Sequence, residues 1–196
     1  MENRVFLAGK VSGFSDTEFT LSNKNLNIRV FITKELSDYI EKVSQKFNPN
    51  DELYVVVHGF LATLPEYTYV FPYNVVFSKE PQKEASNVVF SGKLSDVYEY
   101  ENRYRLFIHS ERKGKITKMF ATLFKDDFGN LNPKSLIGQS VAVIGRLTSN
   151  RDNENASIVV SELYSENTTN SQSVKTEEVQ DLDFSEDPLD SDELMF

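Results

Sequence analysis

The chain contains no cysteine and no tryptophan, and it has only two histidines, His58 and His109. Without cysteine, a disulfide scaffold, a thiol nucleophile and a Cys-ligated zinc site are excluded. Two histidines leave little for a histidine-based metal centre, and each is better read as an ordinary strand residue. We therefore expect no metal and no other cofactor.

Long apolar runs and catalytic motifs are also missing. No apolar run approaches the roughly 18 residues needed to span a bilayer. The first residues show no basic segment followed by an apolar one, so a soluble cytoplasmic protein is expected. The sequence has no phosphate-binding glycine loop, no Gly-x-Ser-x-Gly motif and no paired-carboxylate motif. These absences favour a protein that is not an enzyme.

Net charge is confined to one end of the chain. The whole sequence has 21 basic and 30 acidic residues, a formal net charge of −9. Residues 166–196 contain ten acidic residues and one basic residue, so residues 1–165 are neutral overall. The end segment is rich in Ser, Thr and Asn and has too few apolar residues to fold by burial. We predict a disordered acidic tail.

The preceding 165 residues have the pattern of an almost all-β body. Runs of β-branched and aromatic residues alternate with clusters of Asn, Gly, Asp and Ser, as in short strands joined by turns. The predicted strands are residues 5–11, 26–33, 53–61, 67–77, 88–94, 104–109, 116–124, 140–147 and 156–163. Helical periodicity is convincing only over residues 35–47.

The strand pattern occurs twice, in two units of about 80 residues each. Each unit has a Gly-Lys pair in its first strand, Gly9-Lys10 and Gly92-Lys93, and a glycine inside a later Val-rich strand. Five strands, an interruption after the third and a glycine within a strand match the order of an OB-fold barrel. We predict tandem OB-fold barrels at 1–80 and 86–165, followed by the tail at 166–196. Two unrelated small sheets are the alternative.

Several of these motifs resemble bacterial single-stranded DNA-binding protein (SSB). The openings Phe-Leu-Ala-Gly-Lys-Val and Phe-Ser-Gly-Lys-Leu look like the first strand of that family, and Ile-Gly-Arg-Leu at 144–147 looks like its fourth. The ending, Asp190 to Phe196, is similar to the acidic tip of the family, with Met195 where proline usually stands. The resemblance implies that four barrels form the working unit, hence a homodimer of this two-barrel chain.

Alternation along two strands brings aromatic and cationic residues to the outside of both barrels. In the second barrel Lys118, Phe120 and Phe124 point outward, whereas Met119, Ala121 and Leu123 point inward. In the first barrel Arg29 and Phe31 point outward, whereas Ile28, Val30 and Ile32 are buried. Aromatic rings and cations are what a non-specific binder of single strands needs. The alternative is that these rings cover a second layer or a subunit contact.

A hairpin in the second unit combines tyrosines and arginines and leads into the densest basic run of the chain. Residues 81–165 have a net charge of +2 and residues 1–80 a net charge of −2, so the second barrel is the expected phosphate binder. Four aromatic residues of the first barrel could belong to the core, to a dimer contact or to the binding surface, and the sequence leaves these roles open. They are Tyr67, Tyr69, Phe71 and Tyr73. The predicted nucleic-acid-binding residues are Arg29, Phe31, Lys93, Tyr98, Tyr100, Arg103, Tyr104, Arg105, Arg112, Lys113, Lys115, Lys118, Phe120, Phe124 and Arg146.

The end of the tail combines acidic residues with apolar ones. A terminal Phe offers a ring to an apolar pocket and a carboxylate to a neighbouring base, and acidic neighbours steer it toward basic partners. The alternative is a device that only keeps the chain soluble. The predicted partner-binding residues are Asp192, Glu193, Leu194, Met195 and Phe196.

Together these features predict a protein that binds and protects single-stranded DNA without sequence preference. It would act in DNA replication, repair or recombination, and would recruit partner proteins through the tip of the tail. Two alternatives stay open: an OB-fold module that binds another protein, and a binder of single-stranded RNA, because stacking alone does not tell RNA from DNA.

Overall fold

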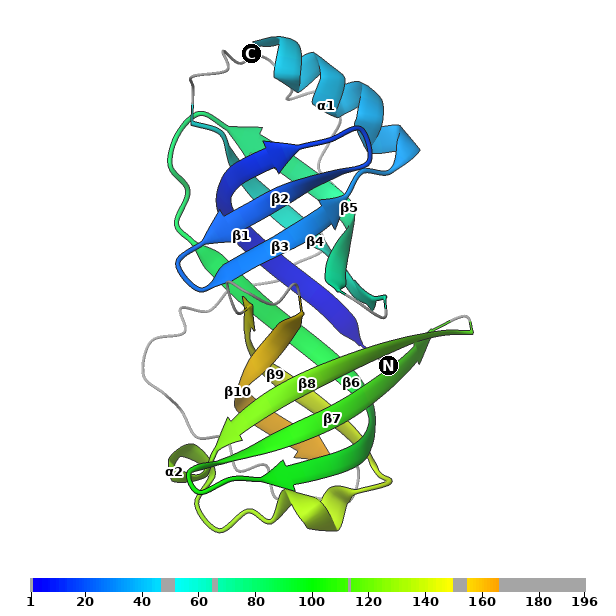
Figure 1. Cartoon of the computed structure of the whole chain (residues 1–196), viewed down its shortest axis with the longest axis vertical. Helices are drawn as coiled ribbons and strands as arrows, with labels where there is room; N and C mark the ends of the chain where they lie inside the picture. Colours follow the sequence, from blue (N-terminus) through cyan, green and yellow to red (C-terminus); the bar gives the residue numbers. More distant parts are fainter. Residues whose placement is uncertain (1, 47–51, 65–66, 113, 150–154, 166–196) are drawn as a thin grey trace, which may run out of the picture.

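The computed structural model describes residues 2–46, 52–64, 67–112, 114–149 and 155–165 (Figure 1). The first half contains β1 (Asn3–Phe14), β2 (Glu18–Asn23), β3 (Leu26–Phe31), α1 (Lys34–Lys46), β4 (Tyr54–Thr63) and β5 (Thr68–Ser78). The second half contains β6 (Ala85–Glu99), β7 (Arg103–Arg112), β8 (Lys115–Phe124), α2 (Lys125–Phe128), η1 (Pro133–Leu136), β9 (Ser140–Ser149) and β10 (Ala156–Ser165). The predicted all-β fold class is confirmed. The predicted acidic tail lies outside the described residues.

Each set of five strands closes on itself with the same connectivity. In the first set β1 pairs with β2 and β4, β3 pairs with β2 and β5, and β4 pairs with β5. In the second set the matching pairs are β6–β7, β6–β9, β7–β8, β8–β10 and β9–β10. Only the third and fifth strands of each set run parallel among these pairs. Two closed five-stranded barrels of the OB type follow from this order.

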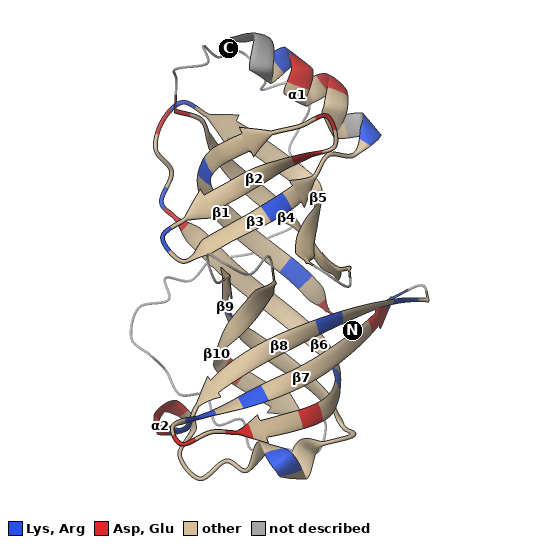
Figure 2. Ribbon diagram, viewed as in Figure 1, with Lys and Arg blue, Asp and Glu red and all other residues tan. Residues whose placement is uncertain are grey.

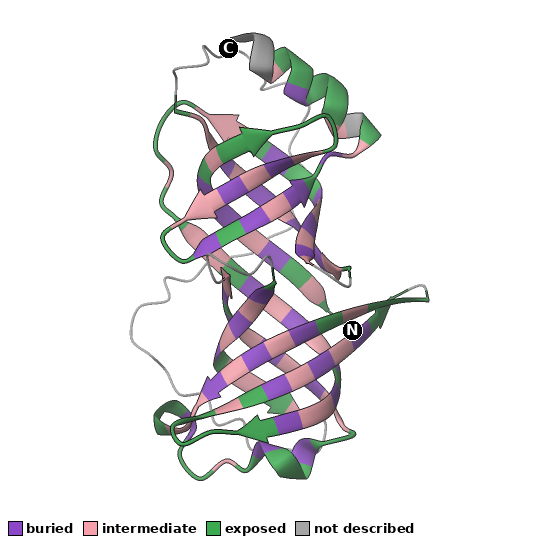
Figure 3. Cartoon of the chain, viewed as in Figure 1, coloured by how far each residue is buried: buried purple, intermediate pink, exposed green. Residues whose placement is uncertain are grey.

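Buried and less buried residues alternate along strands such as β3, β4 and β8 (Figure 3). On β8 the side chains of Met119, Ala121 and Leu123 are buried in the core, as the alternation predicts. On β3 the same holds for Ile28 and Val30. The outward side chains of these two strands are therefore available for other contacts.

The sequence pattern predicts helix α1 well but does not predict strand β2. The pattern does not predict β2, because Phe19 and Leu21 are its only large apolar residues, although both are buried. Helix α1 ends at Lys46 and begins at Lys34, one residue before its predicted start. In the second barrel the equivalent connection contains only the four-residue helix α2 and the short η1.

The repeated Gly-Lys pairs mark a close approach between strands. A Cβ atom at Gly9 would lie 2.5 Å from the carbonyl oxygen of Ser22, and one at Gly92 would lie 2.1 Å from that of His109. Both separations are far below van der Waals contact, so only glycine fits. Each glycine lies where the first strand of its barrel passes against the second, which explains why the pair occurs twice.

The two barrels are joined edge to edge through their first strands, β1 and β6, which pair antiparallel over six residues each. Val5 pairs with Val88 within this register. On its other edge Val5 faces Gly59 of β4. Val88 likewise faces Gly145 of β9, so the two valines hold the same position in their barrels. An approximate two-fold axis therefore passes through the Val5–Val88 pair.

Two hydrogen bonds between the barrels follow the same symmetry. The backbone N–H of Asn27 on β3 donates to Ser149 Oγ at the end of β9, at 2.7 Å. The backbone N–H of Lys118 on β8 donates to Thr63 Oγ1 at the end of β4, at 3.0 Å. The third strand of each barrel is thus tied to the end of the fourth strand of the other. These contacts set the orientation of the two outward faces relative to each other.

Candidate nucleic-acid interface

The outward face of the second barrel is organised in three rows that cross its strands. The first row is Lys93, His109 and Lys118, in register on β6, β7 and β8. The second row is Asp96, Phe107, Phe120 and Ser157, on β6, β7, β8 and β10. The third row is Tyr98, Arg105, Thr122, Val159 and Arg146, on β6, β7, β8, β10 and β9. An aromatic centre therefore lies between two rows that carry cationic side chains.

The centre of this face is a pair of phenylalanines with an arginine over one of them. The rings of Phe107 and Phe120 are 4.8 Å apart with their planes tilted by 30°. The guanidinium carbon of Arg105 lies 4.0 Å from the ring centroid of Phe120. This is a cation–π contact, which holds the arginine over the ring and keeps its charge at the surface. The sequence predicted Phe120 and Arg105 but missed Phe107.

A groove of about 500 Å³ opens beside this centre. Its walls come from the β6–β7 turn, from the outward faces of β7 and β8, and from the facing ends of β9 and β10. The lining residues are Tyr100, Arg103, Arg105, Phe120, Thr122, Thr148, Ser149, Asn155, Ala156 and Ser157. In OB-folds the second and third strands, with the loops after strands one and four, are the surface that binds oligonucleotides. The groove occupies this location.

Of the two predicted tyrosines near the β6–β7 turn, Tyr100 lines the groove and Tyr98 is in register with Arg105. Tyr98 and Tyr100 are 48% and 44% exposed, which is high for aromatic side chains. The guanidinium carbon of Arg103 lies 5.3 Å from the ring centroid of Tyr100. A hydrogen bond to Asp96 raises the pKa of Tyr98, so its hydroxyl is uncharged at neutral pH. Both rings therefore offer neutral faces next to cations.

Tyr104 is placed differently from its neighbours in sequence. It lies on the core side of β7, where it packs against the hydrophobic core and is partly buried. Lys125 Nζ lies 4.9 Å from its ring centroid. Lys125 and Lys134 both donate to Glu99, and these hydrogen bonds lower the pKa of Glu99 to about 2. The structure thus separates Tyr104 from the face that Arg103 occupies.

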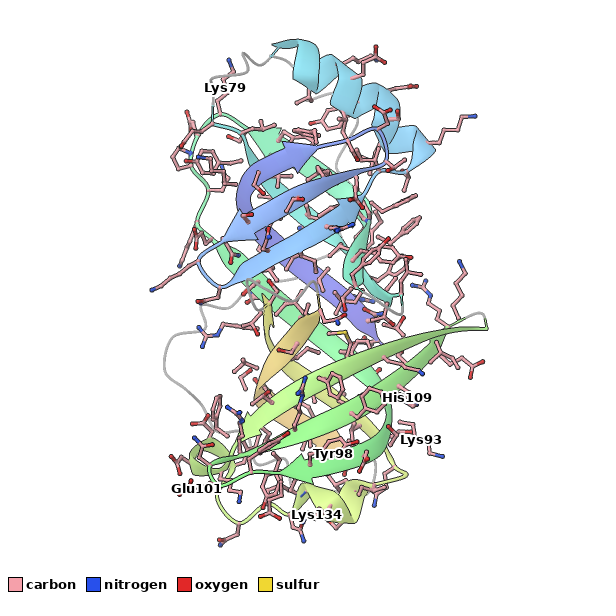
Figure 4. The ribbon with its side chains drawn as sticks, viewed as in Figure 1. Lys79, Lys93, Tyr98, Glu101, His109 and Lys134 are labelled. Atoms are coloured by element: carbon pink, nitrogen blue, oxygen red, sulfur yellow. The ribbon has the colours of Figure 1, made fainter. Side chains whose placement is uncertain are left out.

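The first row brings a histidine between two lysines. Figure 4 shows Lys93 and His109 close together on the outside of the second barrel, with Tyr98 nearby. The His109 ring packs edge-on against Phe107, with centroids 4.7 Å apart. Burial, and to a smaller extent the charge of Lys118, lowers the pKa of His109. At neutral pH this row therefore contributes two positive charges and a neutral imidazole.

The remaining predicted residues lie around this face. Arg112 and Lys115 are exposed and lie opposite each other in the strand register at the end of the β7–β8 hairpin. Blue segments run along the front of β7 and β8 in Figure 2. Phe124 is partly buried and in register with Arg103. Arg103 lines the groove, whereas Phe124 does not. Lys113, together with the tail residues Asp192 to Phe196, lies outside the described residues.

The equivalent face of the first barrel differs in charge. The pairing of third and fifth strands puts Arg29 at the position of Phe120, since Arg29 pairs with Tyr69 as Phe120 pairs with Ser157. Arg29 forms an ion pair with Glu18 at 3.3 Å and lies 4.7 Å from the centroid of the Tyr67 ring. Phe31 is 38% exposed and follows on the same face. Both predicted residues are thus outward, but the arginine has an acidic neighbour.

Within the described ranges, His, Asp and Glu nowhere gather in a group of three that could hold a metal ion. No helix in the described part of the chain is long and apolar enough to cross a membrane.

The arrangement of the chain is similar to that of solved single-stranded DNA-binding proteins. The wild-type protein from Thermus aquaticus matches with a TM-score of 0.63 and 15% identity, covering 87% of this chain and 96% of that one. A deletion mutant of the same protein matches with a TM-score of 0.64 and 15% identity, covering 84% and 94%. No protein-family model matches the sequence, and no curated protein matches it either. At this identity the likeness establishes a shared fold.

Proposed function

We propose that the chain binds single-stranded DNA without sequence preference, through the outward face of the second barrel. The observation that carries the proposal is the Phe107–Phe120 centre between two cationic rows, next to the groove. Bases stack on aromatic faces irrespective of sequence, and phosphates bind the flanking cations. The fold shared with a protein described as single-stranded DNA-binding supports the same assignment. Binding of this kind needs no catalytic group, so we propose a non-enzymatic role.

The proposal is tested by titrating fluorescent oligo(dT) against wild-type protein and the Phe107→Leu/Phe120→Leu double variant. Leucine keeps the apolar volume but removes the ring faces. With stacking worth roughly 1–3 kcal/mol per base, the double variant should bind at least about tenfold more weakly. Phe14→Leu, at a ring 45% exposed near α1, is the matched control. Equal binding by wild type and double variant would overturn the assignment.

The two alternatives are separate outcomes of the same titration. An oligo(rU) of equal length that binds as tightly as oligo(dT) would favour a single-strand binder that does not distinguish RNA from DNA. No binding of either polymer at low salt would favour an OB-fold module whose aromatic face contacts another protein.

We further propose that the tip of the tail, Leu194 to Phe196, recruits proteins of DNA replication, repair or recombination. The support is the sequence, in which three apolar residues end an acidic segment. Deleting these three residues should abolish the recovery of partner proteins in a pull-down and leave oligo(dT) affinity unchanged or slightly higher. Recovery of the same proteins with and without the tip would mean that the tail only maintains solubility.

We also propose that the chain is divided into two barrels, residues 1–80 and 86–165, and a tail, residues 166–196. Two copies of this chain would form a homodimer. The resemblance to SSB supports a working unit of four barrels, which two copies of this chain supply. Sedimentation at micromolar concentration should give twice the 22.5 kDa mass of one chain. A mass equal to one chain would refute the dimer.

A further inference from the structure

His109 lies in the first row of the second barrel, between the two lysines of that row. It is in register with Lys93 of β6 on one side and with Lys118 of β8 on the other. Both lysine side chains are exposed, whereas the imidazole is half-buried. The histidine is therefore flanked by cations, at a place where the proposed function requires phosphates to bind.

Two contacts hold the imidazole ring in place. Its edge-on contact with Phe107 joins it to the aromatic centre, since Phe107 lies 4.8 Å from Phe120. Its Nε2 atom lies 3.4 Å from Ser95 Oγ, and that hydroxyl donates its proton to the carbonyl oxygen of Phe107 at 2.9 Å. The Ser95 oxygen then accepts from Nε2–H, so the neutral ring carries its proton on Nε2. The Nδ1 atom is left to take up a second proton.

The surroundings of His109 disfavour a positive charge on its ring in the free protein. Burial, and then the charge of Lys118, hold the pKa of His109 below its ordinary value of 6.5. Lys93 adds a second positive charge from the β6 side. Two carboxylates are close in sequence register. Asp96 of β6 accepts a hydrogen bond from the next backbone N–H at 2.8 Å, and Glu111, two residues along β7, is exposed. The imidazole is therefore neutral at pH 7 before DNA binds.

We propose that His109 is a proton-linked phosphate contact, which takes up a proton when single-stranded DNA binds and makes the affinity for DNA rise as the pH falls. The inference rests on the proposed function and adds a regulation of the same face. A phosphate bound by Lys93 and Lys118 would place negative charge beside the imidazole and offset the lysine charges that disfavour its protonation. The imidazolium would then be a third cation in the row.

The direction of the pH dependence follows from the linkage between protons and DNA. The DNA-bound protein would hold the proton of His109 more tightly than the free protein does. Binding would therefore consume protons over the pH range between the pKa of His109 in the free protein and its higher pKa in the complex. Lowering the pH through that range strengthens binding, and above it the histidine adds no charge.

Oligo(dT) titrations of the full chain at pH 8.0 and pH 5.5, each at several salt concentrations, test the proposal. On acidification the wild-type affinity should rise by about threefold to tenfold, and the salt slope should steepen by about 0.7, the value of one phosphate contact. His109→Gln should largely abolish both changes. His58→Gln is the matched control and should retain both, since His58 packs against Phe6 in the first barrel, with ring centroids 4.8 Å apart. His109→Lys should bind at both pH values about as tightly as wild type does at pH 5.5.

The failures of the two proposals are distinguishable. Wild-type protein that binds oligo(dT) equally at both pH values, or a His109→Gln variant that keeps the full pH dependence, would overturn the role of His109 and leave the proposed function intact. Failure of the wild type to bind at either pH would overturn both proposals.

Proton uptake can also be counted directly, which covers the case of a His109→Gln variant that unfolds at pH 5.5. Calorimetry of oligo(dT) binding at pH 6.5 in two buffers of different ionisation enthalpy gives the number of protons taken up. Wild type and His58→Gln should take up the same fraction of a proton, and His109→Lys should take up less. Equal uptake by wild type and His109→Lys would overturn the proposal.

Discussion

Glu18 of β2 and Arg105 of β7 hold the same position in the two barrels and carry opposite charges. Each is in register with an outward residue on the third strand of its barrel. Glu18 is opposite Phe31, and Arg105 is opposite Thr122. Glu18 forms an ion pair with Arg29, whereas Arg105 lies over the ring of Phe120. One position thus weakens the cationic character of the first barrel and strengthens that of the second. We therefore expect the two barrels to contribute unequally to binding.

Glu18→Gln should therefore raise oligo(dT) affinity by about twofold to fivefold at low salt, because it removes a negative charge beside Arg29 and Phe31, which are predicted nucleic-acid-binding residues. Loss of the partly exposed ion pair should cost only about 0–1 kcal/mol of stability. Asp38→Asn on α1 makes the same charge change away from these two residues. Affinity that rises equally in both variants would show that overall charge alone is responsible.

The stacking residues should contribute unequally. Phe120→Ala should weaken oligo(dT) binding by roughly 1–3 kcal/mol, because its ring lines the groove and forms the centre of the face. Phe124→Ala should weaken binding less, since Phe124 lies outside the groove lining. Anisotropy titrations of both variants at one salt concentration measure the difference. A larger loss of affinity for Phe124→Ala would mean that the bound DNA lies closer to the end of β8 than the groove does.

Gly92→Ala should destabilise the second barrel by more than about 2 kcal/mol, because the added Cβ would lie 2.1 Å from the carbonyl oxygen of His109. Gly13→Ala is the control, since no atom lies within 4 Å of a Cβ at that position. Urea denaturation of the two variants gives both unfolding free energies. Similar values for the two variants would contradict the close approach of β6 and β7.

Acidification should lower stability through the two histidines. Burial lowers the pKa of His58, and burial with the Lys118 charge lowers that of His109, from an ordinary value of 6.5. Below that pH the unfolded chain binds protons that the folded chain does not, so the free energy of unfolding falls as the pH drops through 6.5. Denaturation at pH 7.5 and 5.5 measures the change, which should be smaller in His109→Gln. An increase in stability on acidification over this range would show that these pKa values are raised.

Much of the fold follows from local pattern. Alternation alone predicts that Met119, Ala121 and Leu123 are buried and that Phe120 is not, because the side-chain period of a strand is two. The same rule, applied to β7, separates Tyr104 from Arg103, although the three residues Arg103 to Arg105 are adjacent in sequence. Strand β2 lacks a sufficient apolar run, so its place is determined by the pairing with β1 and β3 rather than by its own pattern.

The candidate site depends more on contacts between distant residues. The importance of Phe107 follows from its register with Phe120, and register is set by the bulge and turn of the barrel rather than by composition. Arg112 and Phe60 are in different barrels and meet only because β1 and β6 pair. No periodicity in the sequence encodes that pairing, which explains why the contact between Arg112 and Phe60 could not be predicted.

The most direct test of the central claim is the salt dependence of oligo(dT) binding by the full chain and by its Phe107→Leu/Phe120→Leu variant. For single strands the logarithm of the binding constant falls with a slope of about −0.7 per phosphate contact. If the cationic rows bind roughly five phosphates, the wild-type slope should be about −3 to −4. The variant should bind more weakly at every salt concentration with an unchanged slope, because it loses stacking and keeps its cations. Salt-independent binding, or a variant that binds as tightly as wild type, would contradict a DNA-binding face built from these rows.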